Sequence, residues 1–194
     1  MNRSAPKGIN MLCISTTDKE KELRSGFDKL IQRAWPTGAP KDFHLRLVCR
    51  DSRQLSLCDF TSEGKMVLTP FFEELKNDLA KHTGTLLLLD PLDKFWTGDK
   101  NSQSQLSEFL DVCLKQLIKE TGCTISLNDD AEGEPCRKNM ENKSFKTVLF
   151  NKAEADGTYT LSRSRAEFGP TGKSSEVSMR LEDGIFVRAD RKAS

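Results

Sequence analysis

The chain has 194 residues, of which 36% are apolar and 30% charged, and its formal net charge at pH 7 is +1. This length suits one domain with a buried core, and the near-zero charge excludes a general electrostatic attraction to nucleic acid. Because the sequence has neither an apolar run long enough to cross a membrane nor a signal-peptide stretch near its start, we expect a cytoplasmic protein with no membrane partner.

The N-terminal third predicts two strands with a helix between them. A short apolar run at residues 9–14 is typical of a buried strand. The sequence Thr17-Asp18-Lys19-Glu20 has the pattern of a capping box that starts a helix, and apolar residues then recur at helical spacing until the loop at 36–38. Alternating apolar residues at 43–47 predict the second strand.

The middle of the chain continues this alternation. Thr69 and Pro70 are typical of an N-cap and a first helical position, and the apolar run 86–89 followed by Asp90 is typical of a central parallel strand. A long helix with regularly spaced apolar residues follows, and the run 123–127 predicts another buried strand. The pattern therefore predicts an α/β fold, a RecA-like mostly parallel sheet flanked by helices.

The pattern changes after residue 127. Residues 128–144 carry many charges without periodicity, which predicts a mobile loop. Short strands follow, separated by Asp-Gly turns at 156–157 and 183–184, and we expect these C-terminal antiparallel strands to extend one edge of the sheet as hairpins. Without a repeat or a linker in the sequence, we expect a single domain over 1–194.

Three stretches between Gly84 and Leu127 match the pattern of a known family. They are Leu86-Leu87-Leu88-Leu89-Asp90-Pro91-Leu92-Asp93-Lys94-Phe95, then Asp99-Lys100-Asn101, then Glu120-Thr121-Gly122-Cys123. These stretches resemble the RecA-superfamily hexameric helicases of the plasmid RepA type. The resemblance implies a RecA-like ATPase core in which Asp90 is the Walker B-like carboxylate, the residue that holds the magnesium of bound ATP in that family.

The resemblance continues more loosely at 7–15 and at 161–170. In the second of these stretches the family presents basic residues to the ATP of a neighbouring subunit, and Arg163 and Arg165 stand there in this chain. Because they are two residues apart on a predicted strand, we expect them to share a face. They are our candidates for partner-facing basic residues, and the alternative is an ordinary solvated strand face.

The departures from the family pattern all concern ATP chemistry. No glycine-rich phosphate loop precedes residue 9, Thr17 stands in place of a catalytic glutamate, and Asn128-Asp129 replaces a histidine pair. Gly172-Lys173-Ser174 ends like a Walker A motif, but Glu167 stands where its first glycine belongs. The resemblance therefore implies a degenerate core lacking Walker A, a pseudo-ATPase more than an enzyme. We expect no cofactor, and residual Mg²⁺ or ATP binding is the less favoured alternative.

These features together predict a non-catalytic accessory or regulatory protein in DNA replication or recombination, from a mobile element. It would act by protein–protein contact with a ring ATPase or helicase, or by self-assembly. One alternative is a diverged ATPase or helicase subunit that completes its site with another subunit. Another is a single-stranded DNA-binding module, whose loop contacts to phosphates would come from Arg137, Lys138, Lys143 and Lys146.

Trp96 follows Phe95, shortly after the carboxyl end of the predicted central strand. Tryptophan at such a position serves either as an exposed anchor for a partner or as a core residue. We expect core packing.

Overall fold

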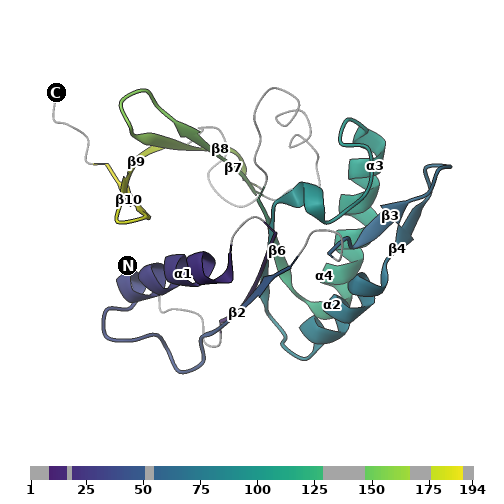
Figure 1. Cartoon of the computed structure of the whole chain (residues 1–194), viewed down its shortest axis with the longest axis horizontal. Helices are drawn as coiled ribbons and strands as arrows, with labels where there is room; N and C mark the ends of the chain where they lie inside the picture. The colour runs from purple at the N-terminus through teal and green to yellow at the C-terminus, as the bar shows by residue number, and fades with distance from the viewer. Residues whose placement is uncertain (1–8, 17–18, 51–54, 129–146, 167–175, 190–194) are drawn as a thin grey trace. The chain divides into compact units, whose positions relative to one another are not determined.

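The computed structural model describes residues 9–16, 19–50, 55–128, 147–166 and 176–189 (Figure 1). Contacts group the chain into two compact units, Met1–Asn139 and Met140–Ser194, and each is described by itself below. The expectation of one domain over 1–194 stays a prediction, and the loop predicted at 128–144 lies outside the described residues except for Asn128. No helix in the described part of the chain is long and apolar enough to cross a membrane.

The first unit is built on a parallel sheet, which confirms the predicted α/β class. Its strands are β1 (Asn10–Ser15), β2 (His44–Cys49), β5 (Leu86–Asp90) and β6 (Thr124–Leu127). Their order in the sheet is β2-β1-β5-β6, and every neighbouring pair is parallel. In the middle of β1, Cys13 is paired with Leu47 of β2 on one side and with Leu88 of β5 on the other.

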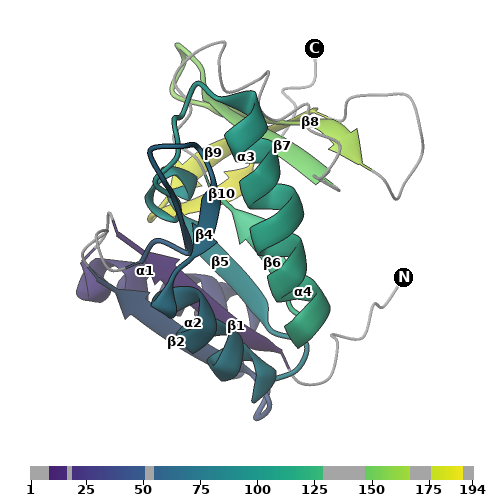
Figure 2. The ribbon, with the colours of Figure 1, turned by 90° about the vertical axis from the view of Figure 1, so that its right-hand side faces the viewer.

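Helices cover the two faces of this sheet unequally. Helix α1 (Glu20–Ala34) lies on one face, and α2 (Pro70–Ala80), α3 (Gln103–Glu108) and α4 (Lys115–Thr121) lie on the other (Figures 1 and 2). A π-helical turn, Phe109–Leu114, joins α3 to α4, and a short 3₁₀ turn, Leu92–Lys94, follows β5.

The start of α1 differs from the capping box expected at Thr17. The N-cap is Lys19, whose side chain makes no capping hydrogen bond, and Thr17 lies outside the described residues. Glu20 and Glu22 stand in the first turn, where their negative charges interact favourably with the helix dipole. Thr69, in contrast, caps α2 as predicted, because its hydroxyl accepts a hydrogen bond from the Phe72 N–H at 3.3 Å.

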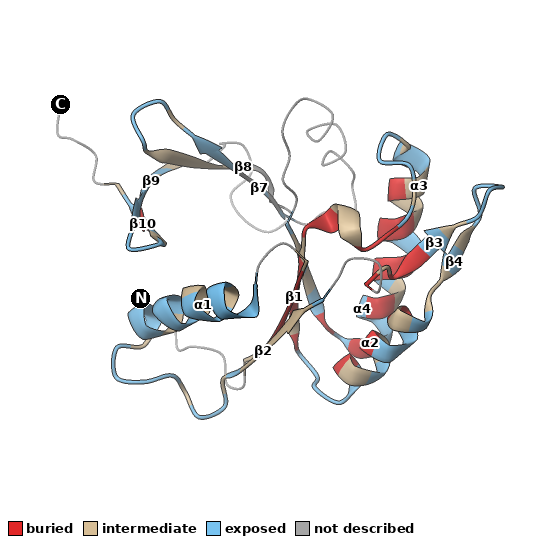
Figure 3. Cartoon of the chain, viewed as in Figure 1, coloured by how far each residue is buried: buried red, intermediate tan, exposed pale blue. Residues whose placement is uncertain are grey.

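The buried core of the first unit lies on the α2 side of the sheet. Leu12 and Ile14 line a hollow with Phe71 and Leu75 of α2, and they pair in register with Leu87 and Leu89. These four strand residues are nearly or fully inaccessible to solvent, and the buried segments of β1 and α2 are red in Figure 3. On the other side, Leu45, Leu47, Leu86 and Leu88 are only half-buried, and α1 has no buried residue at all despite its helical apolar spacing. The sheet therefore has one dry face and one partly wet face.

A short hairpin between β2 and α2 was not apparent from the sequence. Its strands are β3 (Cys58–Phe60) and β4 (Met66–Leu68), and Cys58 also forms a parallel bridge with Trp96. The Trp96 ring stacks on Phe109 at 5.8 Å between centroids and meets the edge of Phe60 at 5.9 Å. Trp96 is 7% exposed, which confirms the expectation of core packing.

The second unit is a separate antiparallel sheet. It contains β7 (Thr147–Ala153), β8 (Tyr159–Ala166), β9 (Glu176–Glu182) and β10 (Ile185–Arg188) in the order β10-β9-β8-β7. The antiparallel strands were predicted, but the expectation that they extend the parallel sheet is wrong. Tight turns at 156–157 and 183–184 join β7 to β8 and β9 to β10, and β8 pairs with β9, so the two hairpins complete a sheet of their own.

Candidate functional site

The carboxyl ends of β1 and β5 form a topological switch point. The chain leaves β1 toward α1 on one face of the sheet and leaves the neighbouring β5 toward α3 and α4 on the other (Figures 1 and 2). In parallel α/β sheets a crevice opens outside the strands at such a point, and ligands bind there. In this chain Thr16, Asp90 and Asn128 meet at that edge of the sheet.

Asn128 holds the Asp90 carboxylate in place. Asp90 is the last residue of β5, as the sequence pattern predicts, and the Asn128 Nδ2 group donates to its Oδ1 atom at 2.8 Å. The Asn128 backbone is fixed as well, because its N–H donates to the Leu89 carbonyl at 2.9 Å and its carbonyl accepts from the Leu92 N–H at 2.6 Å. One residue thus joins the ends of β5 and β6 through its backbone and its side chain.

The end of β1 completes this edge. The Thr16 N–H donates to the Asp90 carbonyl oxygen at 3.1 Å, while the Thr16 hydroxyl is buried and has no hydrogen-bond partner among the described residues. Ser15, just before it, is fully buried. The residues around Asp90 therefore supply one carboxylate, one amide and two hydroxyls.

Among the described residues, this edge of the sheet supplies one carboxylate, that of Asp90, as a ligand for a divalent cation. Mg²⁺ requires several oxygen ligands, and the described residues contain no group of three or more His, Cys, Asp or Glu side chains that could hold a metal ion. One partner of the Asp90 carboxylate is the Asn128 N–H donor, which a cation at the Asp90 Oδ1 atom would have to displace. The role of Asp90 as a Walker B-like residue stays a prediction.

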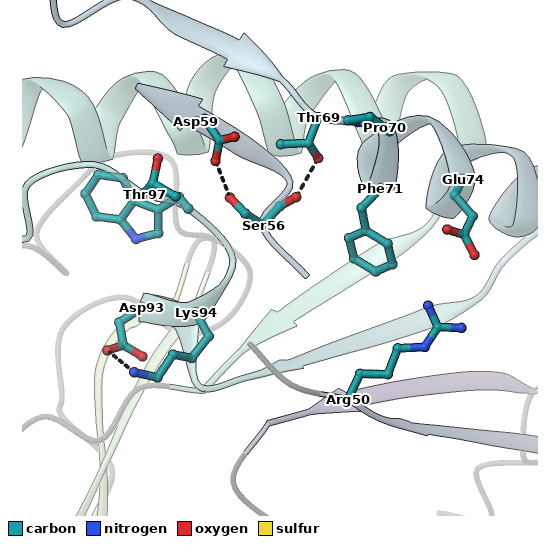
Figure 4. Close-up of a pocket in the computed structure, with 11 residues that line it drawn as sticks. Arg50, Ser56, Asp59, Thr69, Pro70, Phe71, Glu74, Asp93, Lys94 and Thr97 are labelled. Atoms are coloured by element: carbon teal, nitrogen blue, oxygen red, sulfur yellow. Dashed lines mark hydrogen bonds and ion pairs between the residues drawn. The ribbon is translucent and has the colours of Figure 1, made fainter. Parts of the chain in front are cut away.

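A cavity of about 770 Å³ lies beside this edge of the sheet, on the α2 side (Figure 4). Arg50 comes from the end of β2, Ser56 and Asp59 from the β3 region, Phe71 from the start of α2, and Lys94 from the turn after β5. Thr69 Oγ1 donates to the Ser56 carbonyl at 2.5 Å, and the Ser56 hydroxyl donates to Asp59 Oδ1 at 3.0 Å. These bonds fix the wall formed by the hairpin and α2.

Asp93 forms the charged floor of this cavity. Its carboxylate pairs with Lys100 and, at 3.4 Å, with Lys94. Burial of Asp93 opposes ionisation, but the two ammonium groups outweigh that effect, so the pKa of the Asp93 carboxyl lies below its usual range. This cavity is not predictable from the sequence, because its residues come from four segments that only the hairpin brings together.

The predicted partner-facing arginines lie on β8 of the second unit. Arg163 pairs with Leu149, but Arg165 pairs with Val148, because the register shifts between the two β7 residues. A β-bulge of this kind interrupts the regular alternation of a strand. The spacing of two residues therefore no longer implies that Arg163 and Arg165 share a face. The predicted DNA contacts, Arg137, Lys138, Lys143 and Lys146, lie outside the described residues.

Comparison with known families identifies one match. Residues 2–128 match the family model described as an AAA domain. The match spans the whole parallel sheet of the first unit and ends at Asn128, the residue that contacts Asp90. No curated protein matches the chain.

Proposed function

The chain belongs to the AAA domain family of ATPase-type domains, and we propose that within it this protein is a non-catalytic accessory subunit. In this proposal it binds a RecA-like ring ATPase of DNA replication or recombination and regulates the ring by protein–protein contact. The observation that carries the proposal is the hydrogen bond from the Asn128 amide to Asp90. It ties the one carboxylate expected to serve ATP into the framework of the sheet.

The residue types around Asp90 support the same proposal. An ATPase of this kind needs a group to orient the attacking water and groups that bind the phosphates. Thr17 and Asn128 stand where the resemblance places a glutamate and the first of two histidines, and neither residue is a general base. Glu167 breaks the Walker A-like stretch that ends at Ser174.

The first prediction is that the purified protein does not hydrolyse ATP. Steady-state phosphate release in the presence of Mg²⁺ should equal that of buffer, and Asp90→Ala should not change it. Turnover near one per second, within the range typical of enzymes, that disappears in Asp90→Ala would contradict the proposal. That result would favour the alternative of a diverged ATPase that completes its site with another subunit.

The partner surface in this proposal is the β8 region of the second unit. Arg163 is half-buried there as a whole residue. Arginine binds phosphate through two parallel hydrogen bonds, and charges at an interface set specificity and encounter rate. A subunit that presents such arginines to the nucleotide edge of an active neighbour, and offers no ATP site in return, would cap or stall the ring.

The experiment for this surface compares two double variants. We expect Arg163→Ala with Arg165→Ala to recover at least about tenfold less ring ATPase from host extract than the wild type, since truncating one partner of a buried charge pair costs about 2–5 kcal/mol. The control replaces Arg180 and Arg188, exposed arginines of β9 and β10 in the same sheet, and should recover as much as the wild type. Circular dichroism should show that all three proteins are folded.

Two outcomes would contradict this model. Equal recovery of the same replication or recombination ATPase by the wild type and the Arg163/Arg165 variant removes the role of these arginines. If none of the proteins recovers an ATPase, the accessory role itself loses its support. Salt-sensitive binding to single-stranded DNA in that case would favour the DNA-binding alternative.

A further inference from the structure

We propose that the groove between edge strand β2 and helix α2 binds an extended acidic segment of a partner protein, which adds a strand to the sheet. The groove, called here the β2–α2 groove, is lined by Arg46, Val48 and Arg50 from the β2 segment and by Phe71, Glu74 and Leu75 from α2. It lies within the first unit, so its use does not depend on Arg163 or Arg165.

The outer edge of β2 is open among the described strands. This strand is the last of its sheet and pairs only with β1 among the described strands. Its residues from Leu45 to Cys49 are all half-buried, although four of these five are apolar. A strand with an unpaired edge presents N–H and C=O groups to which an extended peptide can pair.

Two neighbouring hollows lie beside this edge. One cavity of about 470 Å³ is lined by both β2 and α2, and it shares Arg50, Phe71 and Glu74 with the cavity of about 770 Å³ in Figure 4. Val48, Phe71 and Leu75 give the groove an apolar wall. A strand added to β2 would place every second side chain toward this wall, which is how strand addition achieves specificity.

Arg46 has an unsatisfied hydrogen-bond donor in the groove. Arg46 donates from Nη1 to Asp78 Oδ2 at 2.6 Å, but its Nη2 atom is buried and has no partner among the described residues. A buried donor without an acceptor costs about 1–3 kcal/mol, and more when it is charged. The Arg46 side chain is 37% exposed as a whole, so a small rotation would bring Nη2 to a carboxylate of a bound peptide, which would supply the missing acceptor.

The charge of the groove also favours an acidic occupant. Three arginines line it, Arg24, Arg46 and Arg50, against the two acids Glu74 and Asp78. Arg24 pairs with Glu20 and Arg46 pairs with Asp78, so Arg50 is the arginine that remains for a bound carboxylate. The terminal segments of this chain are a poor match, because 1–8 carries Arg3 and Lys7 without an acid, and 190–194 carries two basic residues against one acid. We therefore assign the groove to another protein and not to a terminal segment of a second copy. The acidic residues 129–134 of a second copy are the competing occupant, which the concentration dependence below distinguishes.

The test selects binders from a phage-displayed library of random linear peptides, with the full chain as bait. We expect enriched sequences to combine Asp or Glu with β-branched residues over about six positions, the length of β2. Arg50→Glu should weaken a selected peptide at least about tenfold in fluorescence anisotropy, since reversing this charge places like charges together. Arg33→Glu, an equal change in the last turn of α1 and outside the groove, should leave its affinity within about twofold.

Two further measurements separate strand addition from other modes of binding. Bound peptide should slow amide exchange at residues 44–49, and N-methylation of alternate peptide nitrogens should abolish binding because it removes the donors of a β-ladder. The proposal fails if the library yields no enrichment, if Arg50→Glu binds the same acidic peptides equally well, or if protection falls outside β2. Protection of β2 that grows with protein concentration alone would show that a second copy is the occupant, which also overturns it.

Discussion

Replacing Trp96 with alanine is expected to lower the free energy of unfolding by about 3–5 kcal/mol, the usual cost of truncating a buried aromatic residue. Trp96 is 7% exposed and contacts the rings of Phe109 and Phe60. It also bridges Cys58, so it attaches the β3–β4 hairpin to the rest of the first unit. The cavity left by the indole could not close without moving the hairpin or the π-helical turn.

Urea denaturation followed by circular dichroism would measure this loss. Trp35→Ala is the matched control, because Trp35 is half-exposed and contacts mainly Phe43 at 5.1 Å, at the end of α1. We expect a much smaller loss for that variant, about 1 kcal/mol or less. Equal losses for the two tryptophans would show that Trp96 is not the centre of the hairpin attachment.

Gly98→Ala is expected to destabilise the protein by about 1–3 kcal/mol, the usual cost of overpacking. A Cβ atom at position 98 would lie 2.1 Å from Trp96 Cζ3 and 2.9 Å from Gln105 Oε1. The indole is stacked on Phe109 and cannot move away freely, and the Gln105 oxygen already accepts a hydrogen bond from the Asp99 N–H at 2.7 Å. The added methyl group must therefore displace packed or hydrogen-bonded groups.

The control variant is expected to change the stability of the protein in the opposite direction. Gly26 stands inside α1 with no atom within 4 Å of an added Cβ, so Gly26→Ala should stabilise the protein by about 0.5–1 kcal/mol through helix propensity. Thermal unfolding would compare the two variants. The clash should also nearly vanish when Gly98→Ala is made in the Trp96→Ala background, because the two residues are in contact. Additive losses in that double variant would contradict the clash as the cause.

The parallel core was predictable because its signals are local. Apolar runs at 86–89 and 123–127, helical spacing between them and a Thr-Pro helix start all lie within short stretches of sequence. The hairpin was missed because β3 and β4 have three residues each, too few to show a period. The prediction that the C-terminal strands extend the parallel sheet was wrong. Alternation of apolar and polar residues shows which residues of one strand share a face, but it does not show which distant strand pairs with it.

The candidate site was predictable only in part. The sequence predicts Asp90 at a strand end, and it shows Asn128 where the resemblance has a histidine. That the Asn128 amide turns toward Asp90 depends on the register of β5 with β6, which only the structure provides. The β-bulge between Arg163 and Arg165 likewise left no mark in the sequence, since no glycine or proline stands there.

The absence of buried residues in α1 bears on how the native state opens. Regions that bury little apolar surface form the least stable cooperative units of a protein and exchange their amides through local opening. Helix α1 buries none of its residues, whereas α2 anchors Phe72, Leu75 and Leu79 in the core. Helix α1 should therefore open and close as its own unit at a small fraction of the global unfolding free energy. Of these two helices, α1 should be cut by proteases before α2.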